Sequence, residues 1–348
     1  MSPDSEIIFE RRGTAGLITL NRPQALNAVT HDMVRSLARQ LAEWADEPSV
    51  LRVIVTAAGG RAFSAGGDLR SLYELGRAGR YEEALAFWRD EYRLNVFIKR
   101  YRKPYVALID GLVMGGGVGV SVHGSHRVAG DGFRFAMPEV GIGFFPDVGA
   151  TWFLPRLEGE LGTYCALTGD RLDAADASCS GIATHRVQSS ALPDLLEALC
   201  TAVSVDAILG AFRQPADEGT VTRQCDAINR LFRADRIEDI LTALDAEKEA
   251  ADFARSAATA IRGKSPLSLK IALAQLRRGG GLDFDECMRT EFRVVSRVVR
   301  GHDFYEGIRA VIVDKDQAPQ WRPPTLAAIS DAEVDRHFAP IEDELVLP

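Results

Sequence analysis

The sequence predicts an α/β fold in which strands run into glycine-rich turns that open helices, followed by a mainly helical C-terminal region. Residues 51–56 form a β-branched, apolar run that leads into the glycine pair at 66–67. Residues 105–109 form a second such run, which leads into the glycine run at 115–117. Beyond about residue 191 the apolar side chains recur with the spacing of helices.

The N-terminal elements follow from alternation and capping signals. Residues 7–11 and 15–20 predict a short hairpin, and Thr30 is a suitable N-cap for the helical pattern that follows it. The apolar side chains of that pattern lie on one helical face: Met33, Leu37, Leu41 and Trp44.

Two further helices are predicted before the glycine run at 115–117. Asp68 follows the first glycine pair and can cap the next helix. A long helix is expected over residues 81–101, and Glu91 lies close to its apolar face. Glu91 is either a functional acid or an ordinary solvated glutamate of the helix. Backbone N–H groups at a helix start point at whatever lies before it. Two strands that deliver glycines to helix starts can therefore place two N–H donors around one oxygen, as in an oxyanion hole.

Two carboxylates follow the second glycine run. Residues 127–129 and 133–137 resemble strands joined across residues 130–132, and Glu139 and Asp147 come after them, eight positions apart. Their surroundings in the sequence are almost free of other charges. Burial in an apolar site destabilises an ionised carboxylate, so carboxylates at such positions indicate a functional site. We therefore expect both acids to have a function; a salt-bridged acid and a turn residue are the alternatives for Glu139 and Asp147.

The rest of the chain reads as helices, expected over residues 192–205, 237–260, 266–277 and 284–299. Pro215 and Gly219 mark a boundary between two regions of the chain, and the density of charged residues rises after it. We therefore divide the chain into a core over residues 1–210 and a mainly helical region over residues 211–348.

Composition excludes several classes of protein. Of the 348 residues 46% are hydrophobic and the net charge is −8, and no basic stripe with interleaved aromatics suggests a nucleic-acid partner. The five cysteines are never paired at metal-ligand spacing, and the six histidines form no ligand cluster, so neither disulfides nor a metal site is expected. The glycine spacing matches neither a dinucleotide-binding turn nor a P-loop. Residues 1–10 lack a targeting pattern and no apolar run reaches about 20 residues, which predicts a cytoplasmic location and no membrane partner.

Three segments together resemble the crotonase, or enoyl-CoA hydratase/isomerase, superfamily. They read AFSAGGDL at 62–69, GLVMGGGVG at 111–119 and FAMPEVGIGFFPDVGA at 135–150. The 3-hydroxyisobutyryl-CoA hydrolase branch is the most similar, and the resemblance to it continues through residues 166–187, 265–276 and 300–321. It covers nearly the whole chain, least clearly residues 188–264. It implies a crotonase-type ββα spiral core that carries the active site, with the helical region completing the fold and the oligomer contacts.

The resemblance also implies roles for individual residues. Gly67 and Gly116 match the two oxyanion-hole donors, and Glu139 matches the catalytic glutamate. Asp147 stands where the hydrolase branch and some isomerases are acidic. Glu91 matches a further acidic position, at the acyl end of the site. Substrate binding is thus expected from Glu91, Gly116, Glu139 and Asp147.

One position departs from the pattern of the hydratases. Gly119 stands where hydratases commonly have a second glutamate, so the pair of glutamates that holds water for addition to a double bond is incomplete. This departure favours thioester hydrolysis, with 3-hydroxyisobutyryl-CoA as substrate, as in valine breakdown. An enoyl-CoA hydratase, an enoyl-CoA double-bond isomerase and a non-catalytic acyl-CoA binder are the alternatives.

The resemblance also implies partners. The substrate is an acyl-CoA, and coenzyme A belongs to that substrate, so no separate cofactor is expected. Relatives commonly assemble as trimers or dimers of trimers, which implies a homo-oligomer. Arg70 and Lys315 are candidates for binding the CoA phosphates, although spacing alone does not select them.

Overall fold

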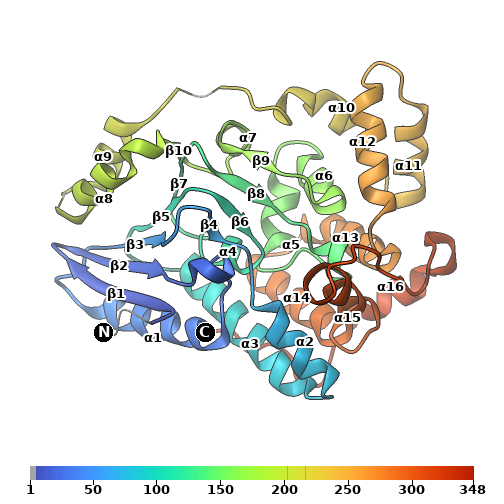
Figure 1. Ribbon diagram of the computed structural model, residues 1–348, viewed down its shortest axis with the longest axis horizontal. Helices are drawn as coiled ribbons and strands as arrows, with labels where there is room; N and C mark the ends of the chain where they lie inside the picture. The colour runs from blue at the N-terminus through green and yellow to red at the C-terminus, as the bar shows by residue number, and fades with distance from the viewer. Residues whose placement is uncertain (1–4, 202, 216) are drawn as a thin grey trace.

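The chain folds around two β-sheets whose strands alternate along the sequence, as the computed structural model shows (Figure 1). The structure describes residues 5–201, 203–215 and 217–348. The larger sheet has the strand order β1-β2-β3-β5-β7-β10 and the smaller one β4-β6-β8-β9.

The larger sheet is parallel except at its N-terminal edge. β1 and β2 form the predicted hairpin, and each later neighbour pairs in parallel. Its strands are β1 (Ile7–Arg12), β2 (Ala15–Leu20), β3 (Arg52–Ala57), β5 (Tyr105–Ile109), β7 (His126–Ala129) and β10 (His185–Arg186).

The smaller sheet receives the strand that follows each central strand of the larger one. β4 follows β3, β6 follows β5 and β8 follows β7. The strands of this sheet are β4 (Ala62–Ser64), β6 (Leu112–Met114), β8 (Arg134–Ala136) and β9 (Leu172–Asp173). Each turn of the chain therefore contributes one strand to each sheet before a helical segment, which is the ββα spiral expected from the resemblance.

Both faces of the larger sheet are covered. Alternate side chains of its strands belong to two apolar clusters, because successive residues of a strand point to opposite faces. Ile54, Val106 and Leu108 pack with α8 (Leu192–Thr201) and α9 (Val205–Phe212). Val53, Val55 and Ile109 belong to the main core with α1 (His31–Asp46) and α3 (Tyr81–Lys99).

Helices occupy most of the chain after β10, and several helices contribute residues to the cleft described below. They are α1 (His31–Asp46), α2 (Leu69–Arg77), α3 (Tyr81–Lys99), α4 (Gly116–Gly119), α5 (Ala150–Phe153), α6 (Leu161–Thr168), α7 (Ala174–Ser180), α8 (Leu192–Thr201), α9 (Val205–Phe212), α10 (Cys225–Leu231), α11 (Ile237–Ala246), α12 (Ala251–Arg262), α13 (Pro266–Gly279), α14 (Phe284–Val298), α15 (Asp303–Ile308) and α16 (Asp331–Phe338). A 3₁₀ turn, η2 (Glu139–Ile142), and a π-helix, η6 (Arg309–Val313), complete the set that matters for the site. Among the described residues no helix is both long and apolar enough to cross a membrane.

Both predicted N-caps are confirmed. The side chain of Thr30 accepts a hydrogen bond from the N–H of Met33 at 3.2 Å, and that of Asp68 accepts one from Ser71 at 3.3 Å. These interactions satisfy N–H groups that have no partner within the first helical turn.

Three predicted elements need correction. The helix expected over 192–205 ends at Thr201, and Val205 begins another helix; residue 202 lies outside the described residues. Residues 127–129 and 133–137 are strands, but β7 and β8 lie in different sheets and are not paired with each other. The helix expected over 237–260 is interrupted at residues 247–250. There, one carboxylate oxygen of Glu247 accepts the N–H groups of Lys248, Glu249 and Ala250, which ends α11 before α12 begins.

Candidate active site

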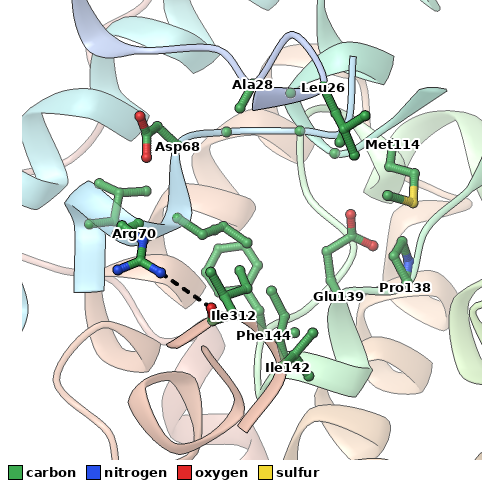
Figure 2. A pocket seen from close by; sticks show the side chains of 18 of the residues that line it. Leu26, Ala28, Asp68, Arg70, Met114, Pro138, Glu139, Ile142, Phe144 and Ile312 are labelled. Carbon is green, nitrogen blue, oxygen red and sulfur yellow. Dashed lines mark hydrogen bonds between the residues drawn. The ribbon is translucent and has the colours of Figure 1, made fainter. Parts of the chain in front are cut away.

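A cleft of about 820 Å³ opens where the two halves of the chain meet. Its walls come from the loop before α1, the turns into α2 and α4, the middle of α3, η2 with the loop after it, and η6. Figure 2 shows Asp68 and Arg70 on one side of the cleft and Met114, Pro138 and Glu139 on the other. Residues of the core and of the helical C-terminal region therefore line the same cleft.

The two glycines predicted to surround one oxygen lie next to each other. A methyl group at Gly116 would lie 3.3 Å from the nitrogen of Gly67 and 2.6 Å from Oε1 of Glu91. Gly66 and Gly115, one residue before each of them, have φ of 110° and 45°, which only glycine adopts readily. Neither the Gly67 nor the Gly116 N–H donates a hydrogen bond to another described residue, so both are available to a ligand.

Glu139 is buried at the start of η2 and is 6% exposed. Its Oε2 has no hydrogen-bond partner among the described residues, and Figure 2 shows the carboxyl directed into the cleft. Burial, and then the negative charge of Asp147, raise the pKa of Glu139 well above its usual value.

Asp147 lies in the loop between η2 and α5 and also lines the cleft. The hydroxyl of Tyr92 donates a hydrogen bond of 2.9 Å to its Oδ2. Burial raises the pKa of Asp147 to about 7, and the hydrogen bond from Tyr92 opposes this rise because it stabilises the charged form. The structure thus brings Asp147 into the same cleft as Glu139.

Glu91 belongs to the buried face of α3 and is 2% exposed, which excludes the interpretation as a solvated helix residue. Its Oε1 has no hydrogen-bond partner among the described residues, and it lines the cleft beside Gly116. Burial, followed by the charges of Asp147 and Glu291, raises the pKa of Glu91 well above its usual value.

Glu291 is a further buried acid close to Asp147, and it was not predicted from the sequence. It lies on α14, is fully buried, and accepts hydrogen bonds from the N–H groups of Gly149 at 2.8 Å and Thr151 at 2.9 Å. Burial and the charge of Asp147 raise the pKa of Glu291 to about 8. A signal was present in the sequence: Glu291 interrupts the apolar face of its helix, three residues after Met288 and four before Val295.

Position 119, where hydratases commonly have a glutamate, has no space for a side chain. A methyl group at Gly119 would lie 2.8 Å from Nδ2 of Asn95 and 3.0 Å from Cβ of Val148. The second glutamate is therefore absent from the sequence, and its place is also filled by neighbouring side chains.

Three basic residues line the cleft: Arg70, Lys264 and Lys315. Arg70 also donates a hydrogen bond of 3.3 Å to the carbonyl oxygen of Ile312, which links α2 to η6 across the cleft (Figure 2). Arg70 and Lys315 were named from the sequence, whereas Lys264 was not.

Comparison with known proteins gives the family that the three sequence segments resemble. The family model for enoyl-CoA hydratase/isomerase matches residues 15–338. The chain belongs to this family. Curated relatives include the mitochondrial 3-hydroxyisobutyryl-CoA hydrolases of Danio rerio, 45% identical over 97% of this chain and 91% of that protein, and of Homo sapiens, 43% identical over 96% and 88%.

Solved structures share the fold of this family member over most of its length. A carnitinyl-CoA dehydratase from Mycobacterium thermoresistibile is 43% identical, with a TM-score of 0.94 over 99% of both chains. An enoyl-CoA hydratase from Rhodobacter sphaeroides 2.4.1 is 39% identical, with a TM-score of 0.91 over 97% of this chain and 98% of that one. A hydratase from Bacillus halodurans, 19% identical with a TM-score of 0.57, shares only the fold.

The names of the curated relatives contradict one prediction. These relatives are mitochondrial proteins, whereas residues 1–10 predicted a cytoplasmic location. That prediction is wrong, because it rested only on the lack of a targeting pattern in the composition of residues 1–10.

Proposed function

We propose that this family member hydrolyses a short β-hydroxyacyl-CoA thioester, with 3-hydroxyisobutyryl-CoA as the preferred substrate. The observation that carries the proposal is the pair Glu139 and Asp147, two buried carboxyls in one cleft with two free glycine N–H groups. The curated hydrolases that are 42–45% identical over nearly the whole chain support the same activity.

In the proposed mechanism the N–H groups of Gly67 and Gly116 bind the thioester carbonyl oxygen. Negative charge grows on this oxygen as the tetrahedral intermediate forms, so donors aimed at it stabilise the transition state more than the substrate. Loss of one such donor costs about 3 kcal/mol in other enzymes.

Glu139 supplies the oxygen nucleophile in this mechanism. Because its pKa is raised, Glu139 must first lose its proton; the carboxylate then either attacks the carbonyl carbon directly or removes a proton from an attacking water. The C–S bond then breaks, and Asp147 transfers a proton toward the departing thiolate or binds the hydroxyl of the acyl group. Both routes consume one water and yield the hydroxy acid and free CoA. Single turnover in ¹⁸O-labelled water tests for direct attack. Water attack on the thioester always labels the product, whereas an anhydride that water opens at the Glu139 carboxyl carbon gives a product with an unlabelled oxygen from Glu139.

Glu91 is proposed to hold the acyl end of the substrate. Its unpartnered buried oxygen lies beside Gly116, and its raised pKa keeps a proton available for a hydrogen bond to the acyl hydroxyl. Arg70, Lys264 and Lys315 would neutralise the phosphates of CoA at the cleft wall. CoA belongs to the substrate, no further cofactor is part of the proposal, and assembly as a trimer or hexamer is proposed from the family alone.

Hydration or dehydration of an enoyl-CoA is the second candidate, because the two solved structures described above are named as a dehydratase and a hydratase. The filled space at Gly119 disfavours it. One assay separates the two reactions. The protein is incubated with 3-hydroxyisobutyryl-CoA, 3-hydroxypropionyl-CoA or crotonyl-CoA, and free thiol and enoyl absorbance are followed.

If the protein is a hydrolase, it should release thiol from the hydroxyacyl substrates. The rate of this release should fall by about 10²–10⁴-fold in Glu139→Gln. Loss of enoyl absorbance from crotonyl-CoA without thiol release from any substrate would refute the hydrolase and establish a hydratase. Binding of all three without any reaction would identify a non-catalytic acyl-CoA binder.

A further inference from the structure

The loop that carries Asp147 has an unfavourable backbone conformation. Val148 has a φ of 52° and Gly149 a φ of 89°, so two consecutive residues are left-handed. A β-branched residue rarely adopts this conformation, because its side chain crowds the neighbouring carbonyl. Such strain persists only where the surroundings hold the chain in place, and it concentrates at functional sites.

Two buried side chains from the helical C-terminal region hold this loop. Glu291 on α14 accepts the N–H groups of Gly149 and Thr151, one with each carboxylate oxygen. Gln275 on α13 donates from Nε2 to the carbonyl oxygen of Pro146 at 2.5 Å and to Oγ1 of Thr151 at 2.7 Å. The backbone is thus tied on both sides of Asp147, by residues more than a hundred positions away. Figure 1 shows α5, which this loop enters, beside α13 and α14.

His123 holds the loop from a third side. Its Nε2 donates a hydrogen bond of 2.7 Å to the carbonyl oxygen of Val148. Burial lowers the pKa of His123 to about 3, so the ring is neutral and carries one N–H. A methyl group at position 149 would lie 2.6 Å from this ring, so the imidazole also fills the space beside Gly149.

None of these three side chains lines the cleft, so substrate contact does not explain their polarity. Glu291 forms no ion pair with another described residue, and a buried carboxyl without a cation is less favourable than an apolar side chain of the same volume. What a carboxyl group offers here, and an apolar side chain does not, is two oxygens that can accept hydrogen bonds from two backbone N–H groups of the loop.

We propose that Glu291 and Gln275 are positioning residues for Asp147, which hold its loop in the strained conformation that turns the carboxyl toward the cleft. The kinetic test of this inference rests on the proposed function, because it measures thiol release. The structural test needs no activity and examines only the geometry of the loop. The two helices beyond residue 260 would thereby determine the orientation of an acid that the spiral core supplies.

The kinetic test compares three variants with the wild type. Glu291→Gln keeps the size of the side chain but replaces one acceptor with a donor that faces a backbone N–H. Gln275→Met removes the donor to Pro146. Asp176→Asn is the matched control, because Asp176 is also buried, at 1% exposure, and accepts two loop N–H groups, from Val221 and Thr222, outside the cleft.

In both positioning variants kcat for thiol release should fall by about 10–100-fold, with KM within about threefold, because misplacing an acid by about 1 Å affects the chemical step more than binding. Asp176→Asn should lower Tm comparably while kcat stays at the wild-type value. Wild-type kcat in folded Glu291→Gln overturns the proposal, and so does an equal loss of kcat in Asp176→Asn. If Glu291→Gln does not fold, Gln275→Met decides; if neither folds, the two residues serve folding and the proposal is wrong.

A crystal structure of Glu291→Gln would determine the conformation of the loop independently of any reaction. The φ of Val148 is expected to become negative, and the hydrogen bond from Tyr92 to Asp147 to be lost. An unchanged loop overturns the positioning role. Absence of thiol release in the wild type, together with an altered loop in the variant, refutes the proposed function and leaves the positioning role standing.

Discussion

The hydroxyl of Tyr92 lies 2.9 Å from Oδ2 of Asp147, and both side chains are buried. This neutral donor is the polar side chain that stabilises the Asp147 charge, and it only partly offsets the effect of burial on the pKa. The acid is therefore held near the pH at which a carboxyl can either donate or accept a proton, which a general acid or base requires.

The raised pKa of Asp147 predicts that the protein loses stability as pH rises from about 4 to 7. The folded state binds the proton with a pKa of about 7 and the unfolded state with one of about 4, so the folded state holds more protons in this window. The free energy of unfolding by urea, measured at pH 5, 6, 7 and 8, should fall over this range.

The Asp147→Asn variant should show a shallower dependence of stability on pH. The substitution removes one titrating carboxyl and also the charge that raises the pKa values of Glu139, Glu91 and Glu291. Asp176→Asn, which leaves these four acids in place, should retain the wild-type slope. Equal slopes in Asp147→Asn and the wild type would show that Asp147 titrates normally in the folded protein.

Gly116→Ala should lower kcat for thiol release by about 10²–10³-fold. The new methyl group would lie between the Gly67 nitrogen and Oε1 of Glu91, where the carbonyl oxygen of the substrate is proposed to bind.

Gly210→Ala is the matched control for that substitution. Gly210 lies within α9 with no atom within 4 Å of the added methyl group, so the variant should keep full activity and gain about 0.5–1 kcal/mol of stability. If Gly116→Ala is as active as this control, the oxygen of the substrate does not lie between the two glycines.

Gly119→Glu should not produce a hydratase, although it restores the glutamate common in hydratases. The side chain would collide with Asn95 and Val148, and overpacking of this kind costs about 1–3 kcal/mol. Crotonyl-CoA absorbance and thermal unfolding of the variant test this expectation. Rapid hydration of crotonyl-CoA by a stable Gly119→Glu protein would show that the absent glutamate alone separates the two activities.

Lys315→Ala should raise KM for the acyl-CoA about tenfold and leave kcat nearly unchanged. A cation that contacts the CoA phosphates interacts equally with substrate and transition state, and such uniform binding affects KM alone. The dissociation constant of free CoA, measured by calorimetry, should rise by the same factor. Lys248→Ala, an exposed lysine on the loop between α11 and α12, is the control. A fall in kcat with unchanged CoA affinity would contradict the assignment of Lys315 to the phosphates.

Features that depend on a few neighbouring residues could be predicted from the sequence. The caps at Thr30 and Asp68 and the two glycine turns are local, and the family pattern placed Glu139 and Asp147 in one site before any distance was known. The separation of β7 and β8 into two sheets was missed, because a Gly-Asp-Gly connection between short strands is equally typical of a hairpin.

Contacts between distant segments could not be predicted. Glu291 and Gln275 reach the Asp147 loop from helices more than 120 residues further along the chain, and helical periodicity places a residue on a face without saying what that face meets. The burial of Glu91 was ambiguous for the same reason, since its position on α3 allowed either solvent or the cleft.

The order in which the cleft is completed has a consequence for translation. Every strand of both sheets has been synthesised once Arg186 has left the ribosome, but the cleft wall also needs Val311, Ile312, Lys315 and Gln317. A nascent chain therefore contains every strand of both sheets well before the residues that complete the wall of the cleft. A premature stop codon shortly before position 311 would spare the residues of every strand and yet remove Val311, Ile312, Lys315 and Gln317 from the wall of the cleft.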